Sequence, residues 1–310
     1  MYLVSDIGGT NTRLALAGAE GVHTGTIASF KNAEESTFLD ILKQFRSNHK
    51  CKKIDGCCVA IAGPVTSSSA RLTNFDWKIT VAEVGALLST ERVLLINDLA
   101  ALGNAVEDLK PPQLAVVRPP SSETTSNNQS LIVGIGTGFN LCAVQHRPAS
   151  RPSCLSVEYG HCGLSARIAE MLDRQFGAAG REMKTVEEIF AGRGFQRLYR
   201  IASNGEERSG NEIMAAHGRG DDPVADLVVR FYAELLSALC HDLAYQYLPL
   251  SGIYFAGSVA RGVLSALDHA EFASAAGTGQ GMPRQFSHIP MSLITDDAAA
   301  LVGCLRRLMV

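Results

Sequence analysis

The sequence has neither an excess of basic residues nor a long apolar run. It has 28 lysines and arginines and 31 acidic residues, so the formal net charge over 310 residues is −3. A chain without a basic patch lacks the electrostatic footprint of a nucleic-acid-binding protein. No stretch approaches the roughly 18 apolar residues that a membrane span requires, and the opening MYLVSD is typical of a strand and not of a secretory signal. We therefore expect a cytoplasmic protein that binds neither nucleic acid nor membranes.

Paired cysteines are missing as well. The eight cysteines lie at positions 51, 57, 58, 142, 154, 162, 240 and 304, and none of them forms a CxxC pair. A closed zinc site takes four ligands, usually in paired short spacings, and His161 with the adjoining Cys162 has no second pair. We expect no zinc, and cysteines that are mostly small buried hydrophobes in a reducing compartment.

The sequence does contain alternating strand and helix patterns, and 46 % of its residues are hydrophobic. Residues 2–30 read as a β-meander broken by glycine turns, and 93–97 form a continuous apolar strand followed by a helical pattern. Residues 131–145 repeat the opening unit of strand, glycine turn and strand, which indicates a weak internal duplication. Residues 222–248 and the last fifteen residues have helical patterns. Together these patterns predict a mixed α/β protein.

Two turns rich in glycine and threonine separate apolar strands. The first spans residues 8–12 in SDIGGTNTRLAL, and the second spans residues 136–138 in GIGTGF. Such turns can present backbone N–H groups, and here the hydroxyls of Thr10 and Thr12, to an anion; the first turn alone fits an ordinary hairpin equally well. Neither turn has the following helix of a Rossmann fingerprint or the lysine of a P-loop. Two of them favour a polyphosphate held from both sides, with Asp6 binding a hydrated Mg²⁺.

Polar residues at three further places suit a substrate. Asn97 and Asp98 follow the apolar strand RVLLI, where Asp98 could serve as a general base towards a hydroxyl beside Asn97, or could cap the next helix. Glu158 and His161 lie three residues apart in VEYGH, and Glu187 follows in VEEIF. Acids and an imidazole suit a neutral polyhydroxylated ligand, while His161 alone could be a buried core histidine.

The motifs resemble, in order, those of the bacterial ATP-dependent glucokinases. They are DIGGTNTR, IAGP, LTNFDW, IND, GIGTGF, VEYGH, VEEIFAGRG and FAGSVARG. This family belongs to the actin-like ATPase superfamily. The resemblance implies a two-lobed actin-like (RNase H-like) α/β fold with mixed sheets and a central cleft for ATP and glucose. The small lobe would be residues 1–110 plus 296–310, and the large lobe residues 111–295.

The resemblance also implies roles for individual residues, with Asp98 as the catalytic base. The residues implied for the sugar are Asn97, Asp98, Gly138, Glu158, His161 and Glu187. The residues implied for ATP are Asp6, Gly8, Gly9, Thr10, Asn11, Thr12, Gly136, Thr137, Gly138, Gly257 and Ser258, with Asp6 holding Mg²⁺ through water. Ser258 departs from the paired glycines usual in the adenosine motif. The cysteine-rich cluster of the related zinc-carrying repressors and kinases is missing, which favours the zinc-free group.

The expected activity is therefore the ATP-dependent phosphorylation of D-glucose at its 6-hydroxyl, a glycolytic reaction, with ATP and Mg²⁺ required and Asp98 as base. The resemblance further implies a homodimer. Two alternatives remain: a kinase for another hexose or an amino sugar, and a sugar-responsive regulator that keeps the fold without turnover.

Overall fold

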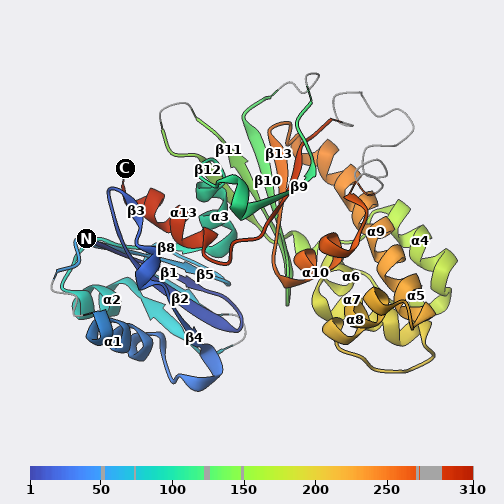
Figure 1. Ribbon diagram of the computed structural model, residues 1–310, viewed down its shortest axis with the longest axis horizontal. Coiled ribbons are helices and arrows are strands. Elements are labelled where there is room, and N and C mark those ends of the chain that lie inside the picture. The colour runs from blue at the N-terminus through green and yellow to red at the C-terminus, as the bar shows by residue number, and fades with distance from the viewer. Residues whose placement is uncertain are drawn as a thin grey trace. The chain divides into compact units, whose positions relative to one another are not determined.

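The computed structural model describes residues 1–49, 53–72, 75–121, 126–147, 150–269, 272 and 288–309 (Figure 1). Two residues of the LTNFDW motif, 73 and 74, lie outside these ranges. The contacts within the chain divide it into two compact units. The first unit holds Met1–Lys110, Arg147–Ser156 and Asp296–Val310, and the second holds Pro111–His146 and Val157–Thr295. Residues 147–156, assigned above to the large lobe, thus have their contacts with the first unit.

A mixed sheet forms the centre of the first unit, in the order β3-β2-β1-β5-β8 with β4 also paired to β2. The strands are β1 (Tyr2–Ile7), β2 (Asn11–Gly18), β3 (Gly21–Val22), β4 (Ala28–Lys31), β5 (Gly56–Ile61) and β8 (Val93–Asn97). β1 and β2 form an antiparallel hairpin, whereas β1, β5 and β8 run parallel, with Ile7 level with Ile61 and Ile61 level with Asn97. The carboxyl ends of these three strands therefore share one edge of the sheet.

Helices cover both faces of this sheet because its buried residues alternate between the faces. They are α1 (Phe38–His49), α2 (Val81–Leu88), α3 (Asp98–Ala105) and α13 (Ala299–Leu308). Leu3 and Ile7 pack with α1 and α2, while Val4 packs with Leu301 and Cys304 of α13. Phe38, Ile41, Leu42 and Phe45 lie at helical spacing in the sequence, and all four are buried in α1.

The second unit repeats the strand arrangement of the first. Its strands belong to a sheet of the order β12-β11-β10-β13-β14-β9, of which β12 up to Ser156 is grouped with the first unit. The strands are β9 (Leu114–Arg118), β10 (Gln129–Ile135), β11 (Phe139–Gln145), β12 (Ser153–Val157), β13 (Gly252–Ala256) and β14 (Met291–Ile294). β10 forms an antiparallel hairpin with β11 and pairs in parallel with β13, as β1 does with β2 and β5. The internal duplication and the mixed α/β class predicted from the sequence are thus confirmed.

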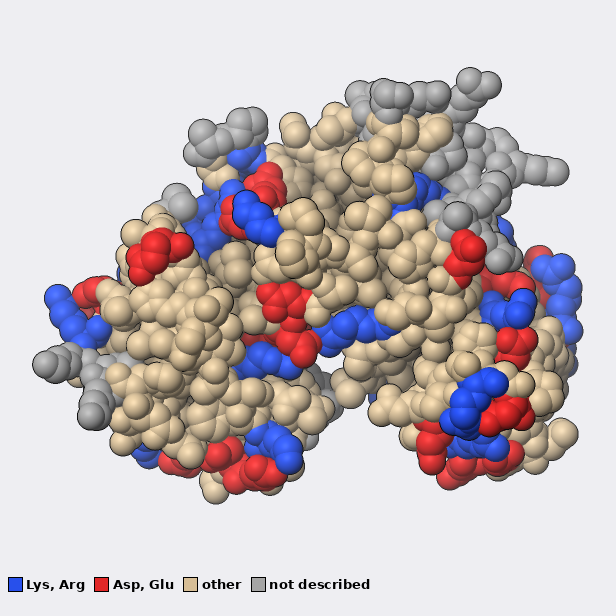
Figure 2. Space-filling model, viewed as in Figure 1, with Lys and Arg blue, Asp and Glu red and all other residues tan. Residues whose placement is uncertain are grey.

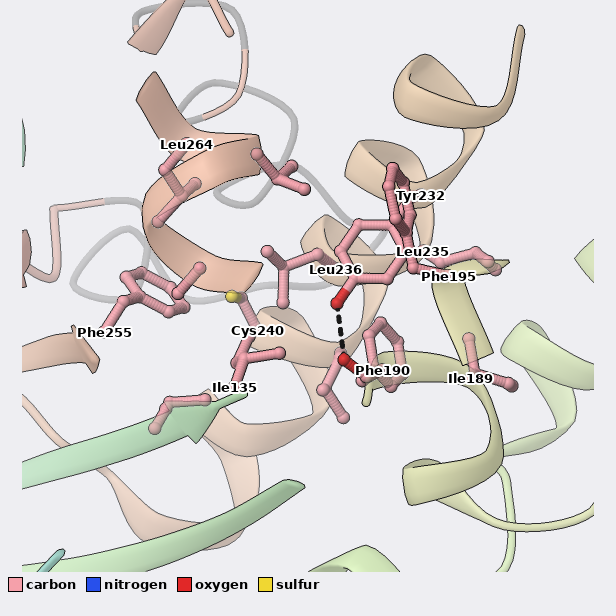
Figure 3. Close-up of a cluster of buried hydrophobic side chains, with 14 of the residues drawn as sticks. Ile135, Ile189, Phe190, Phe195, Tyr232, Leu235, Leu236, Cys240, Phe255 and Leu264 are labelled. Atoms are coloured by element: carbon pink, nitrogen blue, oxygen red, sulfur yellow. Dashed lines mark hydrogen bonds between the residues drawn. The ribbon is translucent and has the colours of Figure 1, made fainter. Parts of the chain in front are cut away.

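Helices of the second unit pack around a long central helix, α9. The helices are α4 (Ala166–Phe176), α5 (Ala178–Arg181), α6 (Val186–Phe190), α7 (Gly192–Ala202), α8 (Gly210–Arg219), α9 (Pro223–Tyr247) and α10 (Ser258–Ala266). The helical pattern of residues 222–248 is confirmed, and Asp222 caps α9 by accepting the N–H groups of Val224 and Ala225. Within the core, the buried Tyr232 hydroxyl donates to the Phe190 carbonyl at 2.7 Å (Figure 3), which fixes α6 against α9.

Short elements complete the fold. They are β6 (Ser69–Arg71), β7 (Lys78–Thr80), and the 3₁₀ turns η1 (Thr24–Thr26), η2 (Asn32–Glu34), η3 (Pro111–Gln113) and η4 (Tyr159–His161). None of the helices described here is both long enough and apolar enough to cross a membrane.

Helices α3 and α13 of the first unit approach each other closely at Gly303 of α13. A Cβ atom added there would lie 1.8 Å from the carbonyl oxygen of Ala101 in α3. No side chain fits at that separation, so the two helices must move apart to accept one. The contact matters because α13 also covers β1 and β5.

We predict that Gly303→Ala lowers the free energy of unfolding by roughly 1–3 kcal/mol through overpacking. The matched control is Gly218→Ala in α8, where an added Cβ meets nothing within 4 Å and the change should leave stability equal or slightly raised. Denaturant unfolding of the two variants measures the difference. Equal midpoints for Gly303→Ala and the wild type would show that α3 and α13 are not held this closely.

Candidate functional site

The turn between β1 and β2 is held by a buried asparagine. The Thr12 hydroxyl donates to Oδ1 of Asn32 at 2.7 Å, and Nδ2 of Asn32 donates to the Gly8 carbonyl at 2.8 Å. The Asn32 N–H also donates to the Thr10 carbonyl at 2.9 Å. Because Thr12 and Asn32 are both fully buried, these bonds fix the turn in one conformation. Sequence reasoning did not single out Asn32, which lies some twenty residues away in a polar stretch.

One residue of this turn differs from its expected role. The Thr12 hydroxyl was expected to face an anion, but it is buried and donates to Asn32. Its role is to fix the turn. Thr10 is exposed, and Gly8 and Gly9 are partly exposed, so a ligand can reach the Thr10 side chain and the glycine backbone.

Asp6 lies at the end of β1, directly opposite Arg13 of β2. An oxygen of Asp6 is 3.9 Å from the Arg13 guanidinium, which also pairs with Asp297, ahead of α13, at 3.2 Å. Burial raises the pKa of Asp6 to about 6; the Arg13 charge lowers it and the Asp297 carboxylate raises it. Asp297 is a residue of this site that the sequence did not reveal, because its helical context in the tail carries no sign of the contact.

Asn97 and Asp98 lie where β8 passes into α3. Oδ1 of Asn97 accepts the N–H groups of Leu99 at 3.0 Å and Ala100 at 3.3 Å, so Asn97 is the N-cap of α3. The interpretation of Asp98 as the helix cap is therefore wrong. Asp98 is instead the first residue of the helix, at the sheet edge that also carries Asp6.

The environment of Asp98 favours its protonated form. Burial and, second, the charge of Asp6 raise the pKa of Asp98 to about 7, although hydrogen bonds from nearby backbone N–H groups and from Asn97 act in the opposite direction. A carboxyl group with a pKa near neutrality can both hold and release a proton under physiological conditions. This is the property required of a general base.

The second glycine turn, in the second unit, is fixed to two helices. The Gly136 N–H donates to the Gly138 carbonyl at 2.9 Å, and the Gly192 N–H at the start of α7 donates to the Gly136 carbonyl at 2.8 Å. Gly257, which precedes α10, has a φ of +98°, and a Cβ there would lie 2.3 Å from the Ile135 carbonyl oxygen. The turn thus lies beside the N-termini of α7 and α10, an arrangement that favours anions. Thr137 at its tip is exposed.

Glu187 contacts this turn and is oriented by two groups. Its Oε2 accepts the Phe139 N–H at 3.0 Å, and its Oε1 pairs with the guanidinium of Arg193. A Cβ on Gly138 would lie 2.9 Å from Oε2 of Glu187. The small size of residue 138 therefore lets the carboxylate approach the turn.

Glu158 and His161 lie at the end of β12 and in η4. Asn140 of β11 donates from Nδ2 to Oε2 of Glu158 at 3.0 Å and accepts the Tyr159 N–H at 3.0 Å. His161 is exposed, so its interpretation as a buried core histidine is wrong. Asn140 and Arg193 were both missed by sequence reasoning; each lies within a few residues of a glycine motif.

Metal-binding groups are sparse in the part of the chain that the structure describes. No group of three or more His, Cys, Asp or Glu side chains there lies close enough to hold a metal ion. Asp6, with 13 % of its side chain exposed, offers a single carboxylate at the sheet edge. One carboxylate fits a magnesium ion that keeps most of its water and is otherwise bound by substrate phosphates.

The raised pKa of Asp98 predicts how stability changes with pH. Between its ordinary value of 3.8 and about 7, the folded protein holds a proton on Asp98 that the unfolded chain has released. Stability must therefore fall as pH rises through this window. In metal-free buffer, Asp98→Asn should make that fall in unfolding free energy shallower, as measured by urea unfolding at several pH values. Identical slopes in the variant and the wild type would contradict the raised pKa.

Comparisons with known proteins agree on one family. A family model described as Glucokinase matches residues 3–309. The glucokinase of Caulobacter sp. (strain K31) is 26 % identical, covering 97 % of this chain and 93 % of that protein. The crystal structure of a glucokinase from an Antarctic psychrotroph has a TM-score of 0.82 at 25 % identity, covering 99 % of this chain and 98 % of that one.

A more distant structure shares the fold. It is a ROK family glucokinase from Streptomyces griseus in complex with glucose and AMPPNP, with a TM-score of 0.66 at 18 % identity, covering 98 % of this chain and 97 % of that one. These likenesses confirm the actin-like α/β fold predicted from the sequence. Because the family model spans nearly all of its residues, this chain belongs to the glucokinase family, a family of sugar kinases.

Proposed function

We propose that this chain transfers the γ-phosphoryl group of ATP to the 6-hydroxyl of glucose, with Asp98 as the general base. The proposal rests on the different roles of Asn97 and Asp98 at the end of β8. Asn97 caps α3, so Asp98 is not needed as the cap, and the pKa of the Asp98 carboxyl is raised to about 7. Membership of the glucokinase family supports the substrates.

In the proposed reaction, Asp98 accepts the proton of the sugar 6-hydroxyl while the hydroxyl oxygen bonds to the γ-phosphorus and the bond to the β-phosphate oxygen breaks. Asn97 uses Oδ1 for the helix cap and hydrogen-bonds the Asp98 carboxyl through its amide group, so one proton of Nδ2 is left that would donate to the sugar. Phosphoryl transfer depends mostly on positioning and charge neutralisation. Because the helix cap fixes the Asn97 side chain, Asn97 would help to position the sugar.

The phosphates of ATP are proposed to bind the two glycine turns. In the first turn, the backbone of Gly8 and Gly9 with Thr10 and Asn11 would bind phosphate oxygens, with Thr12 in support. In the second unit, the residues proposed for the nucleotide are Gly136, Thr137, Gly138, Gly257 and Ser258. Bound Mg²⁺ would neutralise phosphate charge, and Asp6 would hold it through water.

Glucose hydroxyls are proposed to bind Glu158, His161 and Glu187 of the second unit, in addition to Asn97 and Asp98. Asn140 orients Glu158, and the Phe139 N–H with Arg193 orients Glu187. Carboxylates fixed in this way accept hydroxyls in a defined arrangement. A sugar that lacks the matching hydroxyl leaves an acceptor without a partner, at a cost of about 1–3 kcal/mol.

The first test of this function is Asp98→Asn. The amide keeps the size of the side chain but takes no proton, so glucose phosphorylation should slow by at least roughly a hundredfold. The matched control is Asp40→Asn, an exposed acid in the first turn of α1, which should leave turnover unchanged. A coupled ATP assay on both variants, with glucose, other hexoses and amino sugars, measures the effect. Near-normal turnover in Asp98→Asn would refute the assigned base.

A second test concerns the small residue beside Glu187. Gly138→Ala places a methyl group 2.9 Å from Oε2 of Glu187, so the carboxylate and the turn must separate. We expect the KM values for both glucose and ATP to rise severalfold in a folded protein. Gly163→Ala, where an added Cβ meets nothing within 4 Å, is the control. Unchanged KM values for both substrates would contradict the placement of Gly138 in the site.

A further inference from the structure

An open pocket of about 700 Å³ lies on the second unit, along the polar face of α7. Its lining residues are Glu188, Arg193, Gln196, Arg197, Arg200, Glu207, Arg208 and Ser209. None of them belongs to the residues proposed above to contact ATP or glucose. The volume is within the range of small-molecule sites. Figure 2 shows basic and acidic side chains gathered at the end of the second unit where Figure 1 places α5, α7 and α8.

Three arginines of α7 face this pocket at spacings of four and three residues. Arg193, Arg197 and Arg200 therefore lie along one side of the helix, over a length of about 10 Å. The distance is too great for a single phosphate group to contact all three. A guanidinium binds phosphate oxygens through two parallel N–H groups, so the row matches a ligand with two phosphoryl groups.

The acids beside Arg197 and Arg200 leave these two arginines available. Arg197 pairs with Glu182 at 3.3 Å and Arg200 with Glu207 at 3.5 Å, and the two glutamates are 73 % and 81 % exposed. Ion pairs this exposed are weak and exchange readily. The Oε2 atom of Glu188 accepts the N–H groups of residues 184 and 185 at the start of α6, so it is already engaged.

Arg208 forms a fixed wall of the pocket. Its guanidinium pairs with Asp222 at 2.8 Å and with Glu206 at 2.7 Å, and it lies 5.3 Å from the centre of the Tyr199 ring. Asp222 is mostly buried and also accepts the Tyr199 hydroxyl. Because these contacts hold Arg208 in place, the arginines of α7 are the basic side chains of the pocket that a ligand would engage.

We propose that this pocket binds a small molecule carrying a diphosphate or two neighbouring phosphate groups, with Arg197 and Arg200 as its main contacts. The ligand would displace two weak surface pairs and replace them with charge-assisted bidentate contacts. Gln196 and Ser209 add uncharged polar groups to the lining.

Arg193 connects this pocket to Glu187. Its guanidinium pairs with Oε1 of Glu187, whose Oε2 accepts the Phe139 N–H. An anion that draws Arg193 into the pocket removes one of the two groups orienting Glu187. This consequence rests on the proposed role of Glu187 as a sugar ligand, and it predicts that the anion raises the KM for glucose.

Calorimetric titration of inorganic pyrophosphate tests the pocket itself. The protein is first saturated with AMPPNP and glucose in magnesium-free buffer, so that the proposed nucleotide site is occupied. We expect one pyrophosphate to bind, and the double variant Arg197→Gln/Arg200→Gln to bind it at least about tenfold more weakly. Arg230→Gln, an exposed arginine paired at i, i+4 on α9, is the matched control and should bind as the wild type does.

The outcomes separate the two proposals. Equal pyrophosphate affinity in the double variant and the wild type, or no binding to the wild type while AMPPNP binds, would overturn the pocket. Failure of AMPPNP to bind would instead count against the proposed function. In steady-state assays at constant free Mg²⁺, pyrophosphate should raise the glucose KM of the wild type and not of the double variant. An unchanged KM in the wild type would overturn the connection through Arg193.

Discussion

The parallel pairing of β1 with β5 and of β5 with β8 is the constraint on which the first unit depends. It places Ile7, Ile61 and Asn97 level with one another, so that the residues around the ends of β1 and β8 share one edge of the sheet. Asp6 and Asp98 are brought to this edge from positions more than ninety residues apart in the chain. Burial raises the pKa of both carboxyl groups, and the charge of Asp6 also raises the pKa of Asp98. The sheet therefore sets the chemistry of the two carboxyl groups as well as their positions.

The second unit uses the same strand arrangement for a different purpose. Both units carry a glycine turn in their first hairpin, but the first unit has carboxyl groups at its strand ends, whereas the second has the starts of two helices beside its turn. Backbone N–H groups and helix ends give fixed partial positive charge without titratable side chains. The acids of this unit, Glu158 and Glu187, are each oriented by a neighbour on another element. One duplicated topology thus carries two kinds of polar site.

Local pattern predicted much of the fold. The apolar spacing of α1, the cap of α9 at Asp222 and the repeated hairpins all follow from interactions between residues close in sequence. The motifs around Asp98 and Glu187 were found for the same reason, since glycines and acids beside apolar strands are visible in the sequence. The cap of α3 shows the limit of local pattern. Either Asn97 or Asp98 could cap the helix, and only the backbone conformation decides between them.

What the sequence could not predict depends on long-range contacts. Asn32 fixes the first turn from about twenty residues away, and Asp297 reaches Arg13 from the far end of the chain. Neither residue belongs to a periodic pattern or a motif, so only the tertiary structure identifies them. Residues 147–156 are a third case. Their contacts with the first unit cannot be deduced from the strand pattern that they continue.

The position of α13 in the chain has a consequence for biosynthesis. Leu301, Cys304 and Leu308 cover the face of the first sheet that includes Val4 and Ala60, yet they are translated after the whole of the second unit. During translation, that face of the N-terminal sheet therefore stays without α13 while most of the protein is being synthesised. The second unit, whose segments all precede α13, has its full set of residues first. The order of maturation is thus the reverse of the order in which the two units begin, and the nascent N-terminal sheet is the surface that a chaperone would have to shield.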